Sequence, residues 1–185
     1  QEYLYDIIEA MKQGQLIKMT YQSYWRGESN TFDVEPYCVK LFKQRWYLVA
    51  RSPYYNKVMI YSLDRLLHLE VLANEQFKMP DSFNPTEFFK EYYGVIIDSD
   101  FDVEKVKLKV SASQANYLRS LPLHHSQQEI QTTDEYSIFE LRIRPTFDFY
   151  QEILHNGEDM EVLEPLWLRK EIARKIEKMW DKYKS

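Results

Sequence analysis

The chain has 185 residues, of which 44% are hydrophobic and 29% are charged, as in ordinary globular proteins. Its net charge of −5 argues against a protein dominated by nucleic-acid binding, and its single cysteine excludes an internal disulfide framework. No apolar run is long enough to cross a membrane and the N-terminus is no signal peptide, so we expect a soluble cytoplasmic protein.

The first part of the chain is predicted to form one helix and five short strands. Residues 1–13 carry apolar side chains at helical spacing before Gly14, without an N-cap or an initiator Met, so we expect a fragment whose first helix connects to something upstream. Aromatic-rich, alternating runs then predict strands at 16–22, 31–42, 45–52, 57–63 and 66–72. Residues 26–30 have turn chemistry, and Cys38 is expected to be a buried structural thiol. This pattern indicates a small antiparallel barrel or roll.

The second part is predicted to follow a bridge that contains a helix after Asn84-Pro85 and before Gly94. We expect Ser113 to cap a short helix that carries Leu118 and Leu121. The remaining elements are strands at 106–110, 128–133, 136–144 and 160–163, and helices at 147–155 and 165–183. The last helix carries an apolar stripe of Leu168, Ile172, Ile176, Met179 and Trp180. The order β-α-β-β-α-β resembles a ferredoxin-like sandwich with an appended helix, and the fold class is therefore α+β.

Basic side chains are concentrated between residues 40 and 68. This segment carries one acid, Asp64, and six basic residues, which are Lys40, Lys43, Arg45, Arg51, Lys57 and Arg65. An acidic chain with one basic, aromatic-rich segment is consistent with a localised anion site. A solvated strand face explains the same charge equally well.

The run 45–51 combines arginine and aromatic side chains on a predicted strand. On a strand, Arg45, Tyr47 and Arg51 share one face, and we expect Trp46 and Leu48 on the other face to fill the core. Guanidinium groups pair with phosphate through two hydrogen bonds, and aromatic rings stack on nucleobases. The exposed face therefore predicts contacts with a phosphate-bearing ligand.

Three further residues are expected to complete this face. Ser62 and Arg65 end the next strand, and Tyr21 is predicted to face the same groove from the first strand. The alternative, in which Asp64-Arg65 is a structural turn and Arg45 an exposed edge charge, stays open on the pattern alone.

Catalytic and metal-binding patterns are absent from the sequence. The four glycines are too far apart for a phosphate-binding loop, and no spacing of His, Cys, Asp or Glu is typical of a metal site. The neighbours His124 and His125 point in different directions on any regular element, so we expect a loop that caps a helix or contacts a ligand or partner. We expect no enzyme, no metal and no cofactor, with a hydrolase or nuclease as the remaining catalytic alternative.

The residues around Trp46-Tyr47-Leu48 resemble the signature of WYL domains, which are bacterial sensory modules with a small Sm/SH3-like β-barrel. The resemblance extends to Tyr21, to Glu35-Pro36-Tyr37 and to the run 61–66. Ser62 stands where the family frequently has an arginine, which removes one expected basic contact. The second half, with the run 122–127, is similar to the WCX extension that accompanies these domains.

The resemblance implies a regulator fragment with a connector helix (1–14), a WYL barrel (15–78), a helical bridge and linker (79–103) and a WCX-type sandwich (104–185). It implies a homodimer whose helix-turn-helix domain, which would bind promoter DNA, is missing from this chain. The implied ligand is single-stranded nucleic acid or a nucleotide. The expected ligand-binding residues are Tyr21, Arg45, Tyr47, Arg51, Ser62, Arg65 and His125. The alternative function is a dimerisation or protein-interaction module without a nucleotide ligand.

Overall fold

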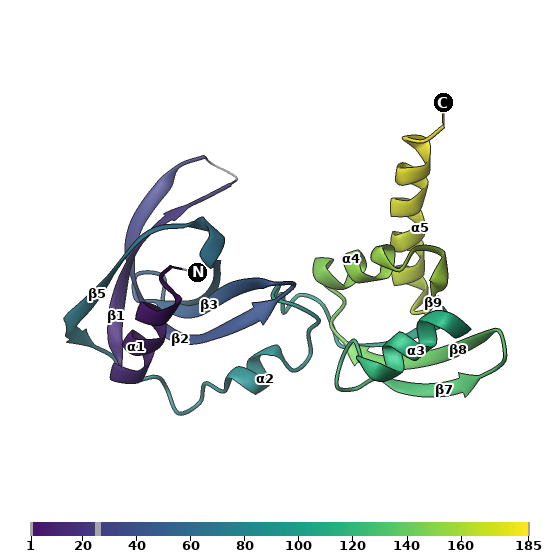
Figure 1. Ribbon diagram of the computed structural model, residues 1–185, viewed down its shortest axis with the longest axis horizontal. Coiled ribbons are helices and arrows are strands. Elements are labelled where there is room, and N and C mark those ends of the chain that lie inside the picture. The colour runs from purple at the N-terminus through teal and green to yellow at the C-terminus, as the bar shows by residue number, and fades with distance from the viewer. Residues whose placement is uncertain (1, 25–26, 185) are drawn as a thin grey trace. The chain divides into compact units, whose positions relative to one another are not determined.

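The chain forms two compact units, Gln1–Pro85 and Thr86–Ser185, in a computed structural model that describes residues 2–24 and 27–184 (Figure 1). Each unit has its own antiparallel sheet, of five strands in the first and four in the second. With five α-helices in the described part of the chain, the protein is a mixed α+β protein, as predicted. Gln1 of the predicted first helix and Arg26 of the predicted turn lie outside the described residues.

The first unit begins with helix α1 (Leu4–Gln13), which confirms the predicted helix from its second turn onward. Ile7 and Ala10 on its apolar face are buried. Gly14 ends the helix in the left-handed region, with φ of 62°, and its N–H bonds the carbonyls of Ala10 and Met11. A glycine is favoured there because it lacks the Cβ that crowds this conformation.

All five predicted strands of the first unit are present. They are β1 (Gln15–Gln22), β2 (Ser29–Phe42), β3 (Arg45–Ser52), β4 (Lys57–Ser62) and β5 (Leu66–Gln76), and the sheet order is β4-β3-β2-β1-β5 with antiparallel neighbours. A single 3₁₀ turn, η1 (Leu63–Arg65), joins β4 to β5, so β4 ends before Leu63. β5 continues to Gln76, beyond residue 72, where this strand was predicted to end.

The core of the first unit follows the alternation of its strands. Ile17 and Met19 of β1 and Leu48 and Ala50 of β3 are fully buried in one cluster. The expectation that Trp46 fills this core is wrong, because its side chain is only half-buried and packs at the margin. Trp46 is the second residue of β3, next to the β2–β3 turn, where the sheet ends and few neighbours remain to cover an indole.

The second unit contains the predicted β-α-β-β-α-β order and the added helix. Its elements are β6 (Glu104–Ser111), α3 (Ala112–Ser120), β7 (Gln128–Thr132), β8 (Tyr136–Ile143), α4 (Phe147–His155), η2 (Gly157–Asp159), β9 (Met160–Glu164) and α5 (Leu166–Asp181). The sheet order is β7-β8-β6-β9, and every neighbouring pair is antiparallel. The bridge helix α2 (Pro85–Phe89) is a single turn and stops well short of Gly94.

The start of α3 differs from its prediction. Ser111, not Ser113, is the N-cap, because the Ser111 hydroxyl accepts a hydrogen bond from the N–H of Gln114. Both serines precede the apolar positions by a plausible distance, so the spacing alone did not separate them. Leu121, predicted to lie on the apolar face, follows the end of the helix and is 79% exposed.

Only the first half of the apolar stripe on α5 is packed. Leu168 and Ile172 are buried, whereas Ile176, Met179 and Trp180 are about half exposed, at 51%, 48% and 59%. Figure 1 shows the reason, because the C-terminal half of α5 extends beyond the sheet of its own unit. Within the described residues, no helix is both long enough and apolar enough to cross a membrane.

Asp148 fastens the chain that precedes β6 to helix α4. Its Oδ2 atom accepts hydrogen bonds from the backbone N–H groups of Val95 and Ile96, at 2.9 and 3.0 Å. Gly94 precedes them with φ of 90°, and a Cβ at this position would collide with the Asp148 carboxylate. The glycine therefore permits both the left-handed backbone and the close approach of the carboxylate.

We expect Gly94→Ala to lower the free energy of unfolding by about 2–4 kcal/mol, because a strained backbone and a displaced carboxylate each cost on the order of 1–3 kcal/mol. Gly157→Ala is the matched control, since Gly157 also has a positive φ but a Cβ added there would meet nothing within 4 Å. Its cost should be only about 1–2 kcal/mol. Equal losses of stability in urea unfolding would contradict the proposed collision.

Candidate functional site

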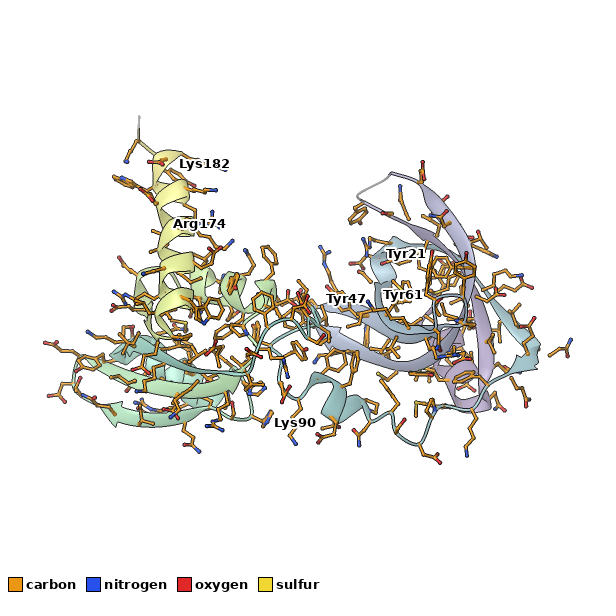
Figure 2. All side chains as sticks on the ribbon, turned by 180° about the vertical axis from the view of Figure 1, so that it is seen from behind. Tyr21, Tyr47, Tyr61, Lys90, Arg174 and Lys182 are labelled. Atoms are coloured by element: carbon orange, nitrogen blue, oxygen red, sulfur yellow. The ribbon has the colours of Figure 1, made fainter. Side chains whose placement is uncertain are left out.

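Tyr21 and Arg65 form the centre of a polar cluster in the first unit. Tyr21 lies near the end of β1, with its ring in the core and 9% of its surface exposed. Its hydroxyl oxygen accepts a hydrogen bond from Nε of Arg65 at 2.8 Å and one from the backbone N–H of Ser62 at 3.0 Å. Figure 2 labels Tyr21 with Tyr61, whose ring meets it edge-on at a centroid distance of 5.3 Å.

Two aromatic rings hold the guanidinium of Arg65. Its Cζ atom lies 4.8 Å from the ring centroid of Tyr21 and 5.1 Å from that of Tyr24. Within residues 2–24 and 27–184, no carboxylate pairs with Arg65, and its hydrogen bond to Tyr21 uses only Nε. The half-buried cation is therefore held in place with its two terminal nitrogens available to an anion.

Burial sets the protonation of the two tyrosines in this cluster. Burial raises the pKa of Tyr21, with the charge of Arg65 acting in the opposite direction, and raises the pKa of Tyr61 to about 12. Both phenols therefore keep their protons at neutral pH. The Tyr21 hydroxyl can accept its two hydrogen bonds and still has a proton to donate.

Arg51, which was predicted to face the ligand, already has partners within its own unit. Its Nη1 atom lies 2.9 Å from Oε1 of Glu35, and both Nε and Nη2 donate to Oδ1 of Asn56. Tyr37 also donates to Glu35, at 3.3 Å. Because all three guanidinium nitrogens are engaged, Arg51 ties β2 and the β3–β4 turn to β3, and it is less suited to an external anion than Arg65.

Arg45 and Tyr47 belong to β3, and Ser62 at the end of β4 belongs to the Tyr21–Arg65 cluster through its backbone N–H. Arg45 is an exposed side chain whose Nε is 3.4 Å from Oδ2 of Asp64, a weak surface pair. The strand register sets Tyr47 opposite Ser62 on one side and opposite Lys40 on the other, so the three share one face. Ser62 therefore connects this row to the Tyr21–Arg65 cluster, whereas Arg51 is engaged in its own network.

His125 belongs to the second unit, whereas the other predicted ligand-binding residues belong to the first. Its exposed ring lies 4.1 Å from the ring of His124, centroid to centroid. His124 is buried, and its ring nitrogens lie 2.7 Å from the hydroxyl of Ser126 and the carbonyl of Lys90. Within the described ranges, no group of His, Cys, Asp and Glu side chains is arranged to hold a metal ion.

The sequence analysis missed Tyr24, the second ring against Arg65. Tyr24 is 68% exposed and follows Tyr21 by three positions, beyond the end of β1. The only available signal was an aromatic residue between the predicted strand at 16–22 and the predicted turn at 26–30. Its role depends on a contact with Arg65, far away in sequence, and strand periodicity does not carry that information.

Two family models match the chain. One describes a WYL domain and matches residues 2–71, and the other describes a WCX domain and matches residues 102–180. No curated protein matches the sequence.

Solved structures resemble the chain over most of its length. Proteasome accessory factor B/C (PafBC) of Arthrobacter aurescens is 21% identical with a TM-score of 0.45, over 94% of this chain and 26% of that protein. A CRISPR Cas-related protein is 14% identical with a TM-score of 0.52, over 96% of this chain and 50% of that protein. The chain thus spans a quarter to a half of the length of these proteins. Its likeness to the CRISPR Cas-related protein is a likeness of fold alone.

The contacts of Arg51 with Glu35 and Asn56 indicate that Arg51 stabilises the fold. Stability measurements can test this role separately from ligand binding. Arg51→Ala should lower the free energy of unfolding by about 1–3 kcal/mol, because it leaves Glu35, whose side chain is 14% exposed, without its charged partner. Arg45→Ala on the same strand is the control, with an expected change within about 0.5 kcal/mol. Equal effects in urea unfolding would exclude a special role for Arg51.

Cys38, which was expected to be buried, is only half-buried. The partial burial of its thiol predicts a measurable pH dependence. Burial raises the pKa of its thiol to about 11, with Lys40 acting in the opposite direction. Iodoacetamide alkylation of the native chain should therefore accelerate about tenfold per pH unit until about pH 11, whereas the chain unfolded in urea should level off near pH 8.5. The native state keeps a proton that the unfolded state loses, so this group lowers stability as the pH rises between these two values. Coinciding pH profiles would contradict the partial burial of the thiol.

Proposed function

Because the chain carries a WYL domain followed by a WCX domain and belongs to the family so defined, we propose that it is the sensing region of a bacterial transcription regulator and is not an enzyme. Its ligand carries phosphate and is a single-stranded nucleic acid or a nucleotide. Binding biases an attached DNA-binding domain.

The observation that carries this proposal is the environment of Arg65. Among the described residues it is a half-buried cation with no acidic partner, whereas Arg45 and Arg51 each have one. A guanidinium fixed by Tyr21 loses little conformational entropy when it binds a phosphate. The exposed ring of Tyr24 beside it can stack on a base, because every nucleobase has a π face.

The other predicted ligand residues have graded roles in this proposal. Tyr47 and Ser62, with Lys40 in the same row, extend the contact along the sheet. Arg45 can exchange its weak pair with Asp64 for a second phosphate. Arg51 acts mainly by holding the strands that present these groups. His125 is part of the WCX domain, so it would contact only a ligand that reaches this domain.

The architecture supports the proposal at the level of fold. We infer that the strand order β4-β3-β2-β1-β5 is that of an Sm/SH3-like barrel, for which we retain residues 15–78. The order β7-β8-β6-β9 with its interleaved helices fits a ferredoxin-like sandwich over residues 104–185. Residues 1–14 would then connect the barrel to the DNA-binding domain, and residues 79–103 would connect the barrel to the sandwich. A ligand that binds one arrangement of the domains more tightly shifts the population toward it.

A second candidate function rests on helix α5. The exposed Ile176, Met179 and Trp180 form an apolar surface of the kind that protein interfaces cover. On this alternative the chain is a dimerisation or protein-interaction module. Unlike the first proposal, this alternative includes no nucleotide ligand.

The test of the sensing proposal is fluorescence anisotropy with short labelled oligodeoxythymidylate across a salt series. We expect saturable binding that weakens with salt, and Arg65→Ala should weaken it about tenfold, because one charged hydrogen-bonded contact is lost. The slope of log K against log salt should fall by about 0.7 in the same variant.

Arg174→Ala is the matched control, because Arg174 is an exposed arginine of the second unit that pairs with Glu171. It should bind like the unchanged chain. Binding that is insensitive to salt, or unaltered binding by Arg65→Ala, would refute the proposed site. Absence of any oligonucleotide binding would favour the interaction module.

A further inference from the structure

The second unit contains a groove of about 450 Å³ whose lining includes none of the predicted ligand-binding residues. It is bounded by α3, by the start of the loop that follows α3, by Tyr93 and by the C-terminal end of α4. Its size is within the range of small-molecule sites, which are mostly apolar with a few polar groups. The chemistry of its lining therefore indicates what it can hold.

The loop that forms one wall is fixed without any ligand. The side chain of Gln127 donates to the carbonyl of Leu118 at 2.8 Å and accepts the N–H of Leu123 at 2.9 Å. His124 adds its bond to the carbonyl of Lys90. A wall held by three hydrogen bonds is preorganised, so an occupant does not lose binding energy by ordering it.

The body of the groove is apolar. Leu118 is 3% exposed at its base, and Leu123 packs against the core of the unit. At the rim, Tyr117 and Leu121 are 68% and 79% exposed. Two large apolar side chains that face solvent beside a hollow leave apolar area that an occupant can cover.

One end of the groove carries negative charge. Glu152 is the only charged side chain among the described residues that line it, and its Oε2 accepts the hydroxyl hydrogen of Tyr93 at 2.7 Å. Beside it, Gln114 donates to Oδ1 of Asn156 at 2.7 Å. Burial, with Glu152 adding to it, raises the pKa of Tyr93, so the phenol stays neutral and the carboxylate is the charge that an occupant meets.

We propose that this groove binds a small amphipathic cation, such as an aryl-alkyl ammonium ion. Its apolar body lies on Leu118 between Tyr117 and Leu121, and its ammonium group bonds the carboxylate of Glu152. The rings of Tyr93 and Tyr117 add cation–π attraction. This site takes the opposite charge from the Arg65 cluster, and the proposal does not depend on nucleotide binding there.

The test uses the whole chain and three probes of similar shape, which are 2-phenylethylammonium, 2-phenylethanol and 3-phenylpropionate. Two-dimensional NMR of the ¹⁵N-labelled chain reports both affinity and location. We expect saturable shifts at Tyr117, Leu121 and Tyr93 with the ammonium ion. The alcohol should bind roughly 3- to 10-fold more weakly, as expected for the loss of one partly exposed ion pair, and the carboxylate more weakly still.

Two variants separate charge from shape. Glu152→Gln keeps an acceptor for Tyr93 and should reduce the affinity for the ammonium ion to that for the alcohol. Leu121→Lys places a like charge at the rim and should weaken ammonium binding by roughly tenfold. Leu67→Lys is its control, because Leu67 is another exposed leucine, at 51%, on β5 of the first unit. It should leave binding unchanged.

Three results would overturn the proposal. One is the absence of saturable shifts with the ammonium ion, and another is shifts that map outside the groove. The third is a preference for the ammonium ion that survives Glu152→Gln. None of these results bears on oligonucleotide binding at Arg65, so the two sites are tested independently.

Discussion

A buried phenol must keep its hydrogen bonds, and the way Tyr21 does so organises the first unit. β4 and β5 lie at opposite edges of the five-stranded sheet, and η1 joins them. The Tyr21 hydroxyl on β1 holds both the last residue of β4 and the side chain of Arg65. One oxygen therefore brings the end of an edge strand to β1 and also orients the cation on which the proposed function depends.

The sequence predicted what local pattern determines. Alternation located the strands and correctly set Tyr47 and Arg51 opposite the buried Leu48 and Ala50. It could not supply partners distant in sequence. The pattern suggested that Arg51 binds a ligand, but Glu35 on the neighbouring strand β2 pairs with its charge. The apolar stripe on α5 was predicted over the whole helix, but the rest of the unit covers only its first half. Periodicity shows which face of a helix is apolar and does not show where the elements that pack on that face end.

The two units present opposite electrostatic environments. In the first, aromatic rings surround a guanidinium, and in the second, aromatic and aliphatic side chains surround a carboxylate. In both, a tyrosine hydroxyl bonds the charged group and fixes its position. A phenol is well suited to this role because its ring packs against apolar neighbours while its hydroxyl remains polar.

The Asp148 contact has a mechanical consequence. Two backbone N–H groups of the incoming chain end on a single carboxylate at the start of α4. The segment just ahead of Gly94 is also held, by the bond from the Tyr93 hydroxyl to Glu152 of α4 and by the ion pair of Glu91 with Arg144. Tension applied to this segment would therefore be shared among several side chains before it reached the rest of the unit. Displacement of any one of them would weaken the attachment without releasing it.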